Sequence, residues 1–356
     1  MTEYFTKTQT AFDACIADES ALTLGIESSC DETAAAVLLG NREVLSMAVH
    51  TQIPIHRLYG GVVPEIASRS HTERITAVVQ EALEKAGVTV DDIGAVAVTS
   101  APGLIGALLV GASFAKGLAY AKDLPMIGVN HIEGHIAANY LTYPDLEPPF
   151  MCLVASGGHS HIVLVKDYDE FELIGRTRDD AAGEAFDKVA RALDLPYPGG
   201  PEVEKLAKQG DPKAFSLHTP FNSDYSSYDF SFSGIKTAVV NLMHNAQQKD
   251  EELNRADIAA SFQRSVTETL TMKSVRAALD RGMGTLALAG GVSANQALRN
   301  RLQRECDKNG IRFCRPDMRF CTDNAAMIAC QGRYRMLKGQ RSDLDLNPSA
   351  ESFLSR

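Results

Sequence analysis

Two histidines and one aspartate have the residue types and spacing for metal chemistry. His131 and His135 follow an apolar segment and are four residues apart, so on a helix both imidazole rings share one face and reach one ion. Solvent-facing or core histidines would give the same spacing. Asp323, at an expected helix start, is the leading candidate for a third ligand, and helix capping is the alternative explanation for it. Such a set leaves coordination positions open, which favours a divalent ion that binds substrate oxygens.

The glutamate between the two histidines argues against a zinc peptidase. Such an enzyme has a glutamate directly after the first histidine, where the carboxylate faces the bound water. In this chain the glutamate is Glu133, two residues after His131. At about 100° per residue, its side chain points about 200° away from that of His131. We therefore do not expect metallopeptidase activity.

Two adjacent carboxylates are candidates for proton transfer. Asp31 and Glu32 follow the expected strand 22–29. In the fold argued below, they lie at the phosphate side of a cleft, where they would act as a general base or orient another group. A solvated turn is the alternative interpretation.

Glycine-containing turns supply candidate contacts for an anionic substrate. Segment 154–160 contains Gly157 and Gly158, and consecutive backbone N–H groups at such a turn suit a phosphate or a ribose. A tight hairpin would have the same composition. Segment 289–295 ends a strand and begins a helix, so the helix N-terminus favours an anion and Asn295 adds a side-chain contact.

Two further segments are candidate ribose contacts. Asp187 follows an expected helix start in segment 179–190, and segment 197–201 is a rigid glycine turn. Neither pattern is specific when it is taken alone.

The elements that must position these residues follow a pattern that occurs twice. The first pass has expected strands at 22–29, 33–40, 43–50, 94–100 and 125–130, with helices at 64–87 and 103–121. The second pass has expected strands at 150–158, 160–166, 172–178 and 285–291, followed by a helix at 294–309. This duplication predicts an α/β chain with a duplicated two-lobe actin/hexokinase/Hsp70-like (ASKHA) fold, mixed sheets and an interlobe nucleotide cleft. A generic two-domain enzyme without a nucleotide is the alternative.

The same pattern sets the expected domain boundaries. We expect a polar N-terminal extension at 1–20, an N-terminal lobe at 21–145, a C-terminal lobe at 146–322 and a tail at 341–356. The helix 323–340 is expected to return to the N-terminal lobe.

Composition is typical of a globular cytoplasmic protein. The 356 residues exceed the usual size of one domain, and 45% are hydrophobic and 22% charged. We expect no secretory leader in the polar opening segment, and no membrane span because Lys116 and three glycines interrupt the apolar stretch 104–121. Seven cysteines without a CxxC pair imply neither a disulfide framework nor a zinc ribbon.

The formal net charge of −10 hides an asymmetry along the chain. Residues 299–341 carry +7, whereas residues 1–298 carry −15. The overall charge argues against a strong nonspecific grip on nucleic acid. The basic segment is either a set of solvated helix faces or a local electropositive surface for phosphates.

Ten sequence blocks, in order from residue 26 to residue 327, carry a family resemblance. The blocks are IESSCDET (26–33), YGGVVPEIASRSH (59–71), SAPGLIGALLVG (100–111), HIEGH (131–135), SGGHS (156–160), DDAAGEAFDKVA (179–190), YPGGP (197–201), FSFSGIKT (230–237), AGGVSAN (289–295) and FCTDNAAM (320–327). Together they resemble the TsaD/Kae1/Qri7 family of tRNA threonylcarbamoyltransferases in its bacterial form, which was once described as an O-sialoglycoprotein endopeptidase family. The first twenty or so residues have no counterpart in this resemblance.

The resemblance implies a reaction and a set of site residues. The threonylcarbamoyl group would pass from threonylcarbamoyl-AMP to the exocyclic amine of the adenosine 3′-adjacent to the anticodon, position 37, in tRNAs that read codons beginning with A, and AMP would leave. The implied metal ligands are His131, His135 and Asp323, with iron as the expected ion and zinc as the alternative. The implied nucleotide and substrate contacts are Val154, Ala155, Ser156, Gly157, Gly158, Asp187, Gly200, Glu204 and Asn295.

The resemblance also implies partners. These are the anticodon loop of tRNA, an inactive paralogue of the same fold (TsaB-like) and a P-loop ATPase (TsaE-like), with an ATP- or AMP-type nucleotide in the cleft. Two alternatives keep the fold: an ATP-dependent sugar or acyl kinase, and a nucleotide-binding scaffold without chemistry. The two histidines favour a softer ion than the magnesium of a kinase, and the complete ligand set argues against a scaffold.

Overall fold

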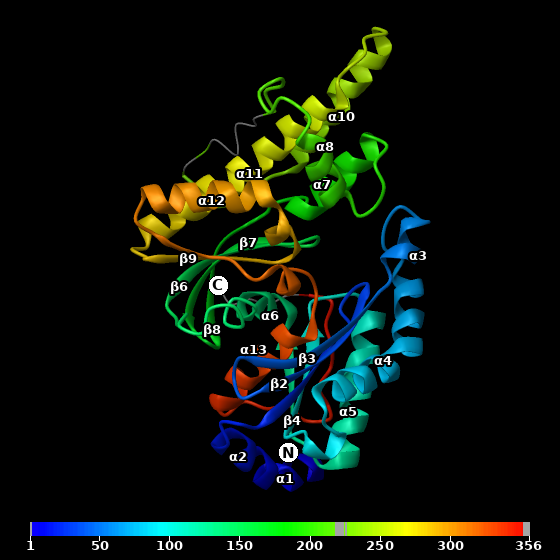
Figure 1. Cartoon of the computed structure of the whole chain (residues 1–356), viewed down its shortest axis with the longest axis vertical. Helices are drawn as coiled ribbons and strands as arrows, with labels where there is room; N and C mark the ends of the chain where they lie inside the picture. Colours follow the sequence, from blue (N-terminus) through cyan, green and yellow to red (C-terminus); the bar gives the residue numbers. More distant parts are fainter. Residues whose placement is uncertain (1, 218–223, 225, 352–356) are drawn as a thin grey trace. The chain divides into compact units, whose positions relative to one another are not determined.

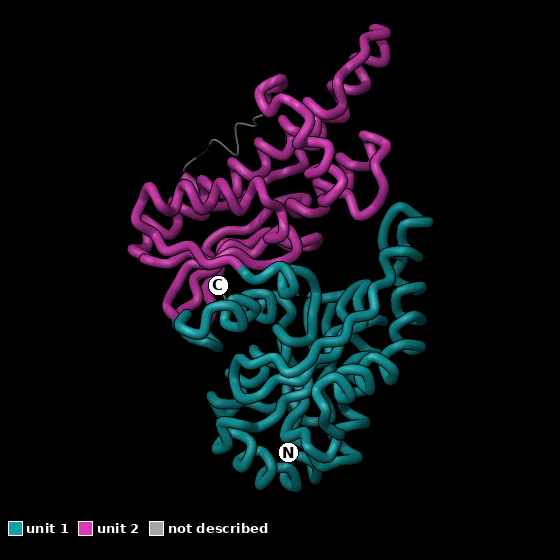
Figure 2. The backbone as a smooth tube through the Cα atoms, in the orientation of Figure 1, with its two compact units in different colours: residues 1–147, 167–170, 316–354 teal, residues 148–166, 171–315, 355–356 magenta. Residues whose placement is uncertain are grey.

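The chain forms two compact units in the computed structural model, which describes residues 2–217, 224 and 226–351 (Figure 2). Unit 1 holds the chain up to Glu147, Asp167–Glu170 and the described chain from Pro316 onward. Unit 2 holds Pro148–Lys166 and Phe171–Arg315. The chain therefore leaves unit 1, builds unit 2 and then returns.

Unit 1 is built on a five-stranded mixed sheet. Its strands are β1 (Leu22–Glu27), β2 (Glu32–Leu39), β3 (Glu43–Thr51), β4 (Ala95–Ala101) and β5 (Met126–Asn130), in the order β3-β2-β1-β4-β5 (Figure 1). The first three strands form an antiparallel meander, and β4 and β5 run parallel to β1. Strands β1, β2 and β4 are apolar along nearly their whole length because both faces of the sheet are covered.

Helices cover both faces of this sheet. The helices of unit 1 are α1 (Glu3–Lys7), α2 (Gln9–Ala17), α3 (Ile53–Arg57), α4 (Pro64–Ala86), α5 (Ile105–Lys122), α6 (His131–Ala137) and α13 (Ala325–Leu337), with 3₁₀ turns at Val90–Asp92 and Met318–Phe320. Leu24 and Ile26 on β1 pack with α4 and α5. Gly25, which points to the other face, lies against α13, where a Cβ would be 2.1 Å from the Ala325 carbonyl oxygen. The absence of a side chain at Gly25 therefore lets α13 lie directly on the strand.

Unit 2 repeats the same strand order. Its strands are β6 (Phe150–Ala155), β7 (Ser160–Asp167), β8 (Glu170–Arg176), β9 (Thr285–Ala289) and β10 (Arg312–Cys314), in the order β10-β9-β6-β7-β8. Strand β7 is antiparallel to β6, whereas β9 runs parallel to both β6 and β10. The meander followed by parallel strands thus occurs in both units, as the duplicated sequence pattern predicts.

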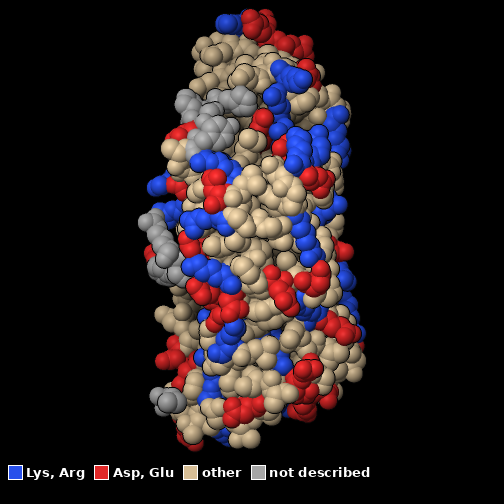
Figure 3. Space-filling model, turned by 90° about the vertical axis from the view of Figure 1, so that its left-hand side faces the viewer, with Lys and Arg blue, Asp and Glu red and all other residues tan. Residues whose placement is uncertain are grey.

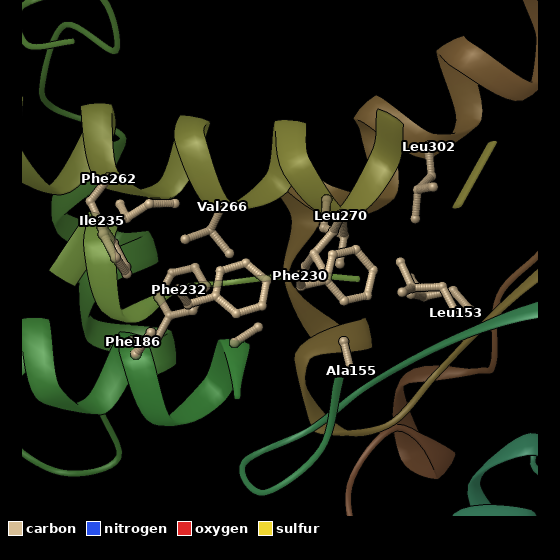
Figure 4. Packing of buried hydrophobic residues seen from close by; sticks show 14 of the residues in the cluster. Leu153, Ala155, Phe186, Phe230, Phe232, Ile235, Phe262, Val266, Leu270 and Leu302 are labelled. Carbon is tan, nitrogen blue, oxygen red and sulfur yellow. The ribbon is translucent and has the colours of Figure 1, made fainter. Parts of the chain in front are cut away.

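The helices of unit 2 enclose an aromatic core. They are α7 (Ala182–Ala192), α8 (Gly199–Ala207), α10 (Ser233–Gln248), α11 (Arg255–Asp280) and α12 (Gln296–Lys308), with a 3₁₀ turn, η2, at Gly291–Ala294. Figure 4 shows Phe186 of α7, Phe262 of α11 and Phe232 packed together, and the ring centroids of Phe186 and Phe262 are 5.1 Å apart. This core fixes α7, which carries Asp187.

The structure differs from the sequence expectations at several element ends, including the starts of two helices, and in the opening segment. Helix α5 begins at Ile105 rather than at 103, and α12 begins at Gln296 rather than at 294 because η2 intervenes. The opening segment forms α1 and α2, and Phe12 and Cys15 are buried. Among the described residues, no helix is both long and apolar enough to cross a membrane.

Candidate metal centre and substrate residues

The two histidines and the aspartate come together in unit 1. The Nε2 atoms of His131 and His135 lie 3.4 Å and 3.3 Å from one carboxylate oxygen of Asp323. One ligand atom from each residue lies within 4.8 Å of the other two. Both histidines are on α6, where Asn130 caps the helix by accepting a hydrogen bond from the Ile132 N–H. The predicted i, i+4 arrangement therefore places three donors around one point.

Asp323 does not cap the helix that follows it. The cap of α13 is Asn324, whose side-chain oxygen accepts a hydrogen bond from the Met327 N–H at 3.0 Å. The capping explanation for Asp323 is therefore wrong, and its carboxylate faces the two histidines instead.

Glu27 orients His131, and the sequence analysis did not assign it this role. The Glu27 carboxylate is fully buried at the end of β1 and lies 2.8 Å from His131 Nδ1. It also accepts a hydrogen bond from the Thr99 hydroxyl at 2.7 Å. A carboxylate on Nδ1 holds the proton there and leaves the Nε2 lone pair for an ion, as in carboxylate–histidine–metal groups. An acidic residue at the end of an otherwise apolar strand is the sequence feature that could have indicated this role for Glu27.

The donor set fits a divalent ion. His135 is fully buried, and neither ring nitrogen has a hydrogen-bond partner among the described residues. Burial lowers the pKa of His131, but Asp323 and Glu27 outweigh burial and raise it well above its usual value. Burial and the positive charge of His131 lower the pKa of His135. The carboxylates therefore favour a positive charge at this point, beside a neutral His135 imidazole whose Nε2 faces Asp323, and both features suit a metal ion.

Glu133 lies on another side of α6. Its carboxylate is 3.7 Å from the Arg335 guanidinium of α13. Burial raises the Glu133 pKa to about 7, against the opposing effect of Arg335. The carboxylate is thus held by α13, which agrees with the geometric argument against a peptidase.

The acidic turn between β1 and β2 is electrostatically coupled to this centre. Asp31 is buried and Glu32 is half-buried. Burial, with Asp323 and Asp31, raises the Glu32 pKa to about 10, and the Thr51 hydroxyl donates to its carboxyl oxygen at 3.2 Å. Glu32 is therefore protonated at neutral pH in the metal-free protein.

The candidate substrate residues Val154 to Gly158 form the end of β6 and its turn in unit 2. Gly157 and Gly158 are exposed, and a Cβ on either glycine would meet no described atom within 4 Å. The Ser156 carbonyl accepts a hydrogen bond from the N–H of Gly183, the second residue of α7. Gly290, with φ +85°, packs against the Ala155 carbonyl. The ends of the parallel strands β6 and β9 and the start of α7 therefore lie together, with the backbone of Gly157 and Gly158 exposed beside them.

The other candidate substrate residues have protein partners in unit 2. One carboxylate oxygen of Asp187 accepts a hydrogen bond from the Gly199 N–H at 2.7 Å, which joins α7 to α8 beside Gly200. Glu204 accepts from the N–H of Gln296, the first residue of α12, at 2.9 Å. Asn295 caps α12 and donates to Gln263 at 2.9 Å. These hydrogen bonds hold in place the loops and helix starts that carry Asp187, Glu204 and Asn295.

The basic segment 299–341 is divided between the two units, and some of its cations are buried or paired with acids. Arg299 and Arg333 are buried and donate to backbone carbonyls. Lys338 pairs with Asp167, and Lys308 with Glu305. Figure 3 shows basic and acidic side chains interspersed on the face that it draws. These four cations of the segment are therefore buried or paired, and the electropositive surface stays a prediction.

Fold and site together define a class of protein. Two units with one strand topology are the duplicated α/β architecture of actin, hexokinase and Hsp70, and unit 1 adds a donor set suited to a divalent ion.

Solved structures share the fold at low sequence identity. A full-length HypF in a phosphate- and nucleotide-bound form gives a TM-score of 0.58 at 16% identity, over 90% of this chain and 46% of that one. Component A of the (R)-2-hydroxyglutaryl-CoA dehydratase of Acidaminococcus fermentans gives 0.51 at 15% identity, over 89% and 99% of the two chains. The chain thus spans about half the length of HypF.

Sequence comparison is more specific. The TsaD family model, described as tRNA N6-adenosine threonylcarbamoyltransferase, matches residues 43–330. Proteins of that name from Clostridium botulinum (strain 657 / Type Ba4) and Clostridium perfringens (strain 13 / Type A) are 56% and 57% identical over 330 and 327 residues, which cover 92% of this chain and 96% of each relative. The chain belongs to the TsaD family of transferases, as its ten sequence blocks predict.

Proposed function

We propose that this chain transfers the threonylcarbamoyl group from threonylcarbamoyl-AMP to N6 of the adenosine at position 37 of tRNAs that read codons beginning with A. The N6 nitrogen forms a bond to the carbamoyl carbon, the bond from that carbon to the phosphate oxygen breaks, AMP leaves, and N6 loses a proton. The observation that carries the proposal is the buried His131–His135–Asp323 group in a chain that belongs to the TsaD family.

His131, His135 and Asp323 would hold one divalent ion, with iron as the expected ion and zinc as the alternative. Bound there, the ion supplies a Lewis acid for phosphate or carbamoyl oxygens. Glu27 keeps the His131 Nε2 atom available, because its own carboxylate binds the opposite ring nitrogen.

The acidic turn handles protons in this proposal. Glu32 carries a proton at neutral pH in the metal-free protein because of burial, Asp323 and Asp31. Asp31 is the adjacent buried carboxylate. We assign to this pair the uptake of the N6 proton and its return to solvent, so replacing either residue by alanine is expected to lower turnover by about a hundredfold or more.

In unit 2, the exposed backbone of Gly157 and Gly158, beside Val154 to Ser156, would bind the phosphate or ribose of the nucleotide. Asp187 and Glu204 hold the surrounding loops through backbone N–H groups, and Asn295 fixes the start of α12. Because the mixed anhydride is already activated, positioning of the amine and the carbonyl is the main task of these residues.

The reaction implies tRNA as a partner, and the family resemblance implies the two protein partners. We propose that the chain works in the cytoplasm with the anticodon loop of tRNA, an inactive paralogue of its own fold and a P-loop ATPase. The target base would leave the stack of the loop before it reacts.

The test is a reconstitution from purified components. The chain is incubated with threonine, bicarbonate, ATP, the synthetase that makes threonylcarbamoyl-AMP, the two protein partners and unmodified tRNA, and the nucleosides are then analysed by mass spectrometry. The expected product is threonylcarbamoyladenosine, formed by the wild type and absent with His131→Ala. Formation of ADP together with a phosphorylated sugar or acid would instead indicate a kinase. Nucleotide binding without any product would indicate a scaffold.

A further inference from the structure

Three successive backbone carbonyls of the acidic turn, those of residues 29–31, are each held by a different part of unit 1. The Ser29 carbonyl accepts a hydrogen bond from the Leu104 N–H at 2.8 Å, just before α5. The Asp31 carbonyl accepts from the Gln52 N–H at 2.9 Å, just after β3. Between them, the Cys30 carbonyl lies 3.0 Å from Nε2 of His71 on α4. Among the hydrogen bonds of the described residues to these three carbonyls, the one to the middle carbonyl comes from a side chain.

The contacts of His71 determine its tautomer. The Cys30 carbonyl is an acceptor, so Nε2 carries the proton and donates it. Nδ1 is then an acceptor, and the Thr33 hydroxyl, 2.7 Å away, donates to it. His71 is fully buried, and burial lowers its pKa, which agrees with a neutral ring. Each ring nitrogen of His71 therefore makes one hydrogen bond. Nε2 binds the residue before Asp31 in the sequence, and Nδ1 binds the residue after Glu32.

We propose that His71 is a positioning residue for the transfer reaction: its Nε2–H fixes the Cys30 carbonyl and thereby the direction in which the Asp31 and Glu32 carboxyl groups point. The ring contacts neither carboxyl group and none of the three candidate metal ligands in the contacts of the described chain. Its effect must therefore pass through the backbone of the turn. The turnover measurement described below rests on the proposed function, whereas the hydrogen-exchange measurement does not.

Two amide variants separate the two hydrogen bonds of His71. The amide nitrogen of glutamine takes the place of Nε2, so His71→Gln keeps a donor for the Cys30 carbonyl. The shorter His71→Asn keeps an acceptor for the Thr33 hydroxyl but does not reach Cys30. His71→Leu removes both bonds, and Glu73→Gln, at an exposed position of the same helix, is the matched control.

The first readout does not depend on activity. Hydrogen exchange of the peptide that spans residues 28–33 is measured by mass spectrometry in the full-length protein. We expect exchange to accelerate about tenfold or more in His71→Leu and His71→Asn, and to stay within about threefold of wild type in His71→Gln and Glu73→Gln. Equal exchange in His71→Gln and His71→Asn would overturn the proposal, because the bond to Cys30 would then have no special role.

The second readout is turnover in the reconstituted reaction at saturating substrate. We expect kcat to fall about tenfold or more in His71→Asn and to recover in His71→Gln, with KM for tRNA and metal content unchanged. In combination with Glu32→Gln, His71→Asn should cause little further loss, since both act through one turn. A fully multiplicative loss would mean that His71 acts elsewhere. If the wild type makes no threonylcarbamoyladenosine, the proposed function fails, and the exchange measurement still decides the role of His71.

Discussion

At the scale of single residues, a histidine in this protein is defined by its partner. His131 has a carboxylate on Nδ1, His135 has no hydrogen-bond partner within the described chain, and His71 uses both ring nitrogens. The first two suit metal ligation and the third suits a structural contact. We therefore expect His131→Ala and His135→Ala to lose the ion, and Glu27→Gln to weaken its binding about 10- to 100-fold. Metal per chain, measured by elemental analysis after dialysis against a graded chelator, checks this order.

The control for that series is His244→Ala, which removes an exposed histidine of α10 in unit 2. It should keep the full metal content. If wild type and both α6 variants retain equal metal, the centre is a cluster of buried polar groups and not a metal site.

The Glu32 carboxyl group gives a pH-dependent prediction for the metal-free protein. Its pKa rises from 4.5 to about 10 on folding, so the folded state binds more protons than the unfolded state between these values. Glu32 is therefore destabilising to an extent that increases as the pH rises above 4.5 and levels off near 10. We expect Glu32→Gln to raise Tm at pH 8 and to have little effect near pH 4.5. A Tm difference that is constant with pH would show that packing, and not ionisation, causes the change.

At the scale of elements, the position of Asp323 depends on how closely α13 approaches the sheet. Gly25 on β1 meets the Ala325 backbone, and Gly332 on α13 meets Ala97 on β4, where an added Cβ would lie 2.5 Å from the Ala97 Cβ. Gly25→Ala must push α13 away, so we expect a loss of about 1–3 kcal/mol in the free energy of unfolding. Metal affinity should fall as well, because Asp323 moves with the helix start.

Gly117 of α5 provides the matched control for this substitution. A Cβ there would meet no described atom within 4 Å. Gly117→Ala should therefore stabilise the protein by about 0.5–1 kcal/mol, since glycine is unfavourable within a helix. Urea unfolding of both variants tests the pair, and a Gly25→Ala protein as stable as the wild type would contradict the close packing of α13.

At the scale of the whole molecule, the opening segment is part of the structure of unit 1. The buried guanidinium of Arg333 donates to the Cys15 carbonyl at 2.6 Å and to the Asp18 carbonyl at 2.7 Å. Arg341 lies 3.6 Å from the centre of the Phe5 ring. Removing residues 2–18 would leave the Arg333 charge buried without these acceptors, so we expect a loss of about 3–5 kcal/mol in the free energy of unfolding.

Replacing Arg333 by methionine in the shortened chain distinguishes this cause from a general loss of packing. The change removes the charge that has lost its Cys15 and Asp18 acceptors and should restore part of the lost stability. Thermal unfolding of the shortened chain with Arg333 and with methionine measures the effect, and equal Tm values would contradict the role of Arg333.

Periodicity and spacing were sufficient to predict the duplicated meander and the His131–His135 pair, because both depend on residues that are close in the sequence. The role of Glu27 was not predictable in that way, since its partner His131 lies 104 residues further along the chain. The same holds for His71, which meets a carbonyl 41 residues away. Asp323 had two equally good local explanations, and only the structure shows that Asn324 takes the capping role.

The return of the chain to unit 1 after Arg315 has a consequence for protein synthesis. Glu27 and both α6 histidines are translated before unit 2, whereas Asp323 is translated after it. A nascent chain therefore holds an incomplete donor set for as long as unit 2 takes to be made. An ion held by all three proposed ligands would therefore be loaded onto the nearly finished polypeptide, and translation that stops within unit 2 would yield a chain without the third ligand.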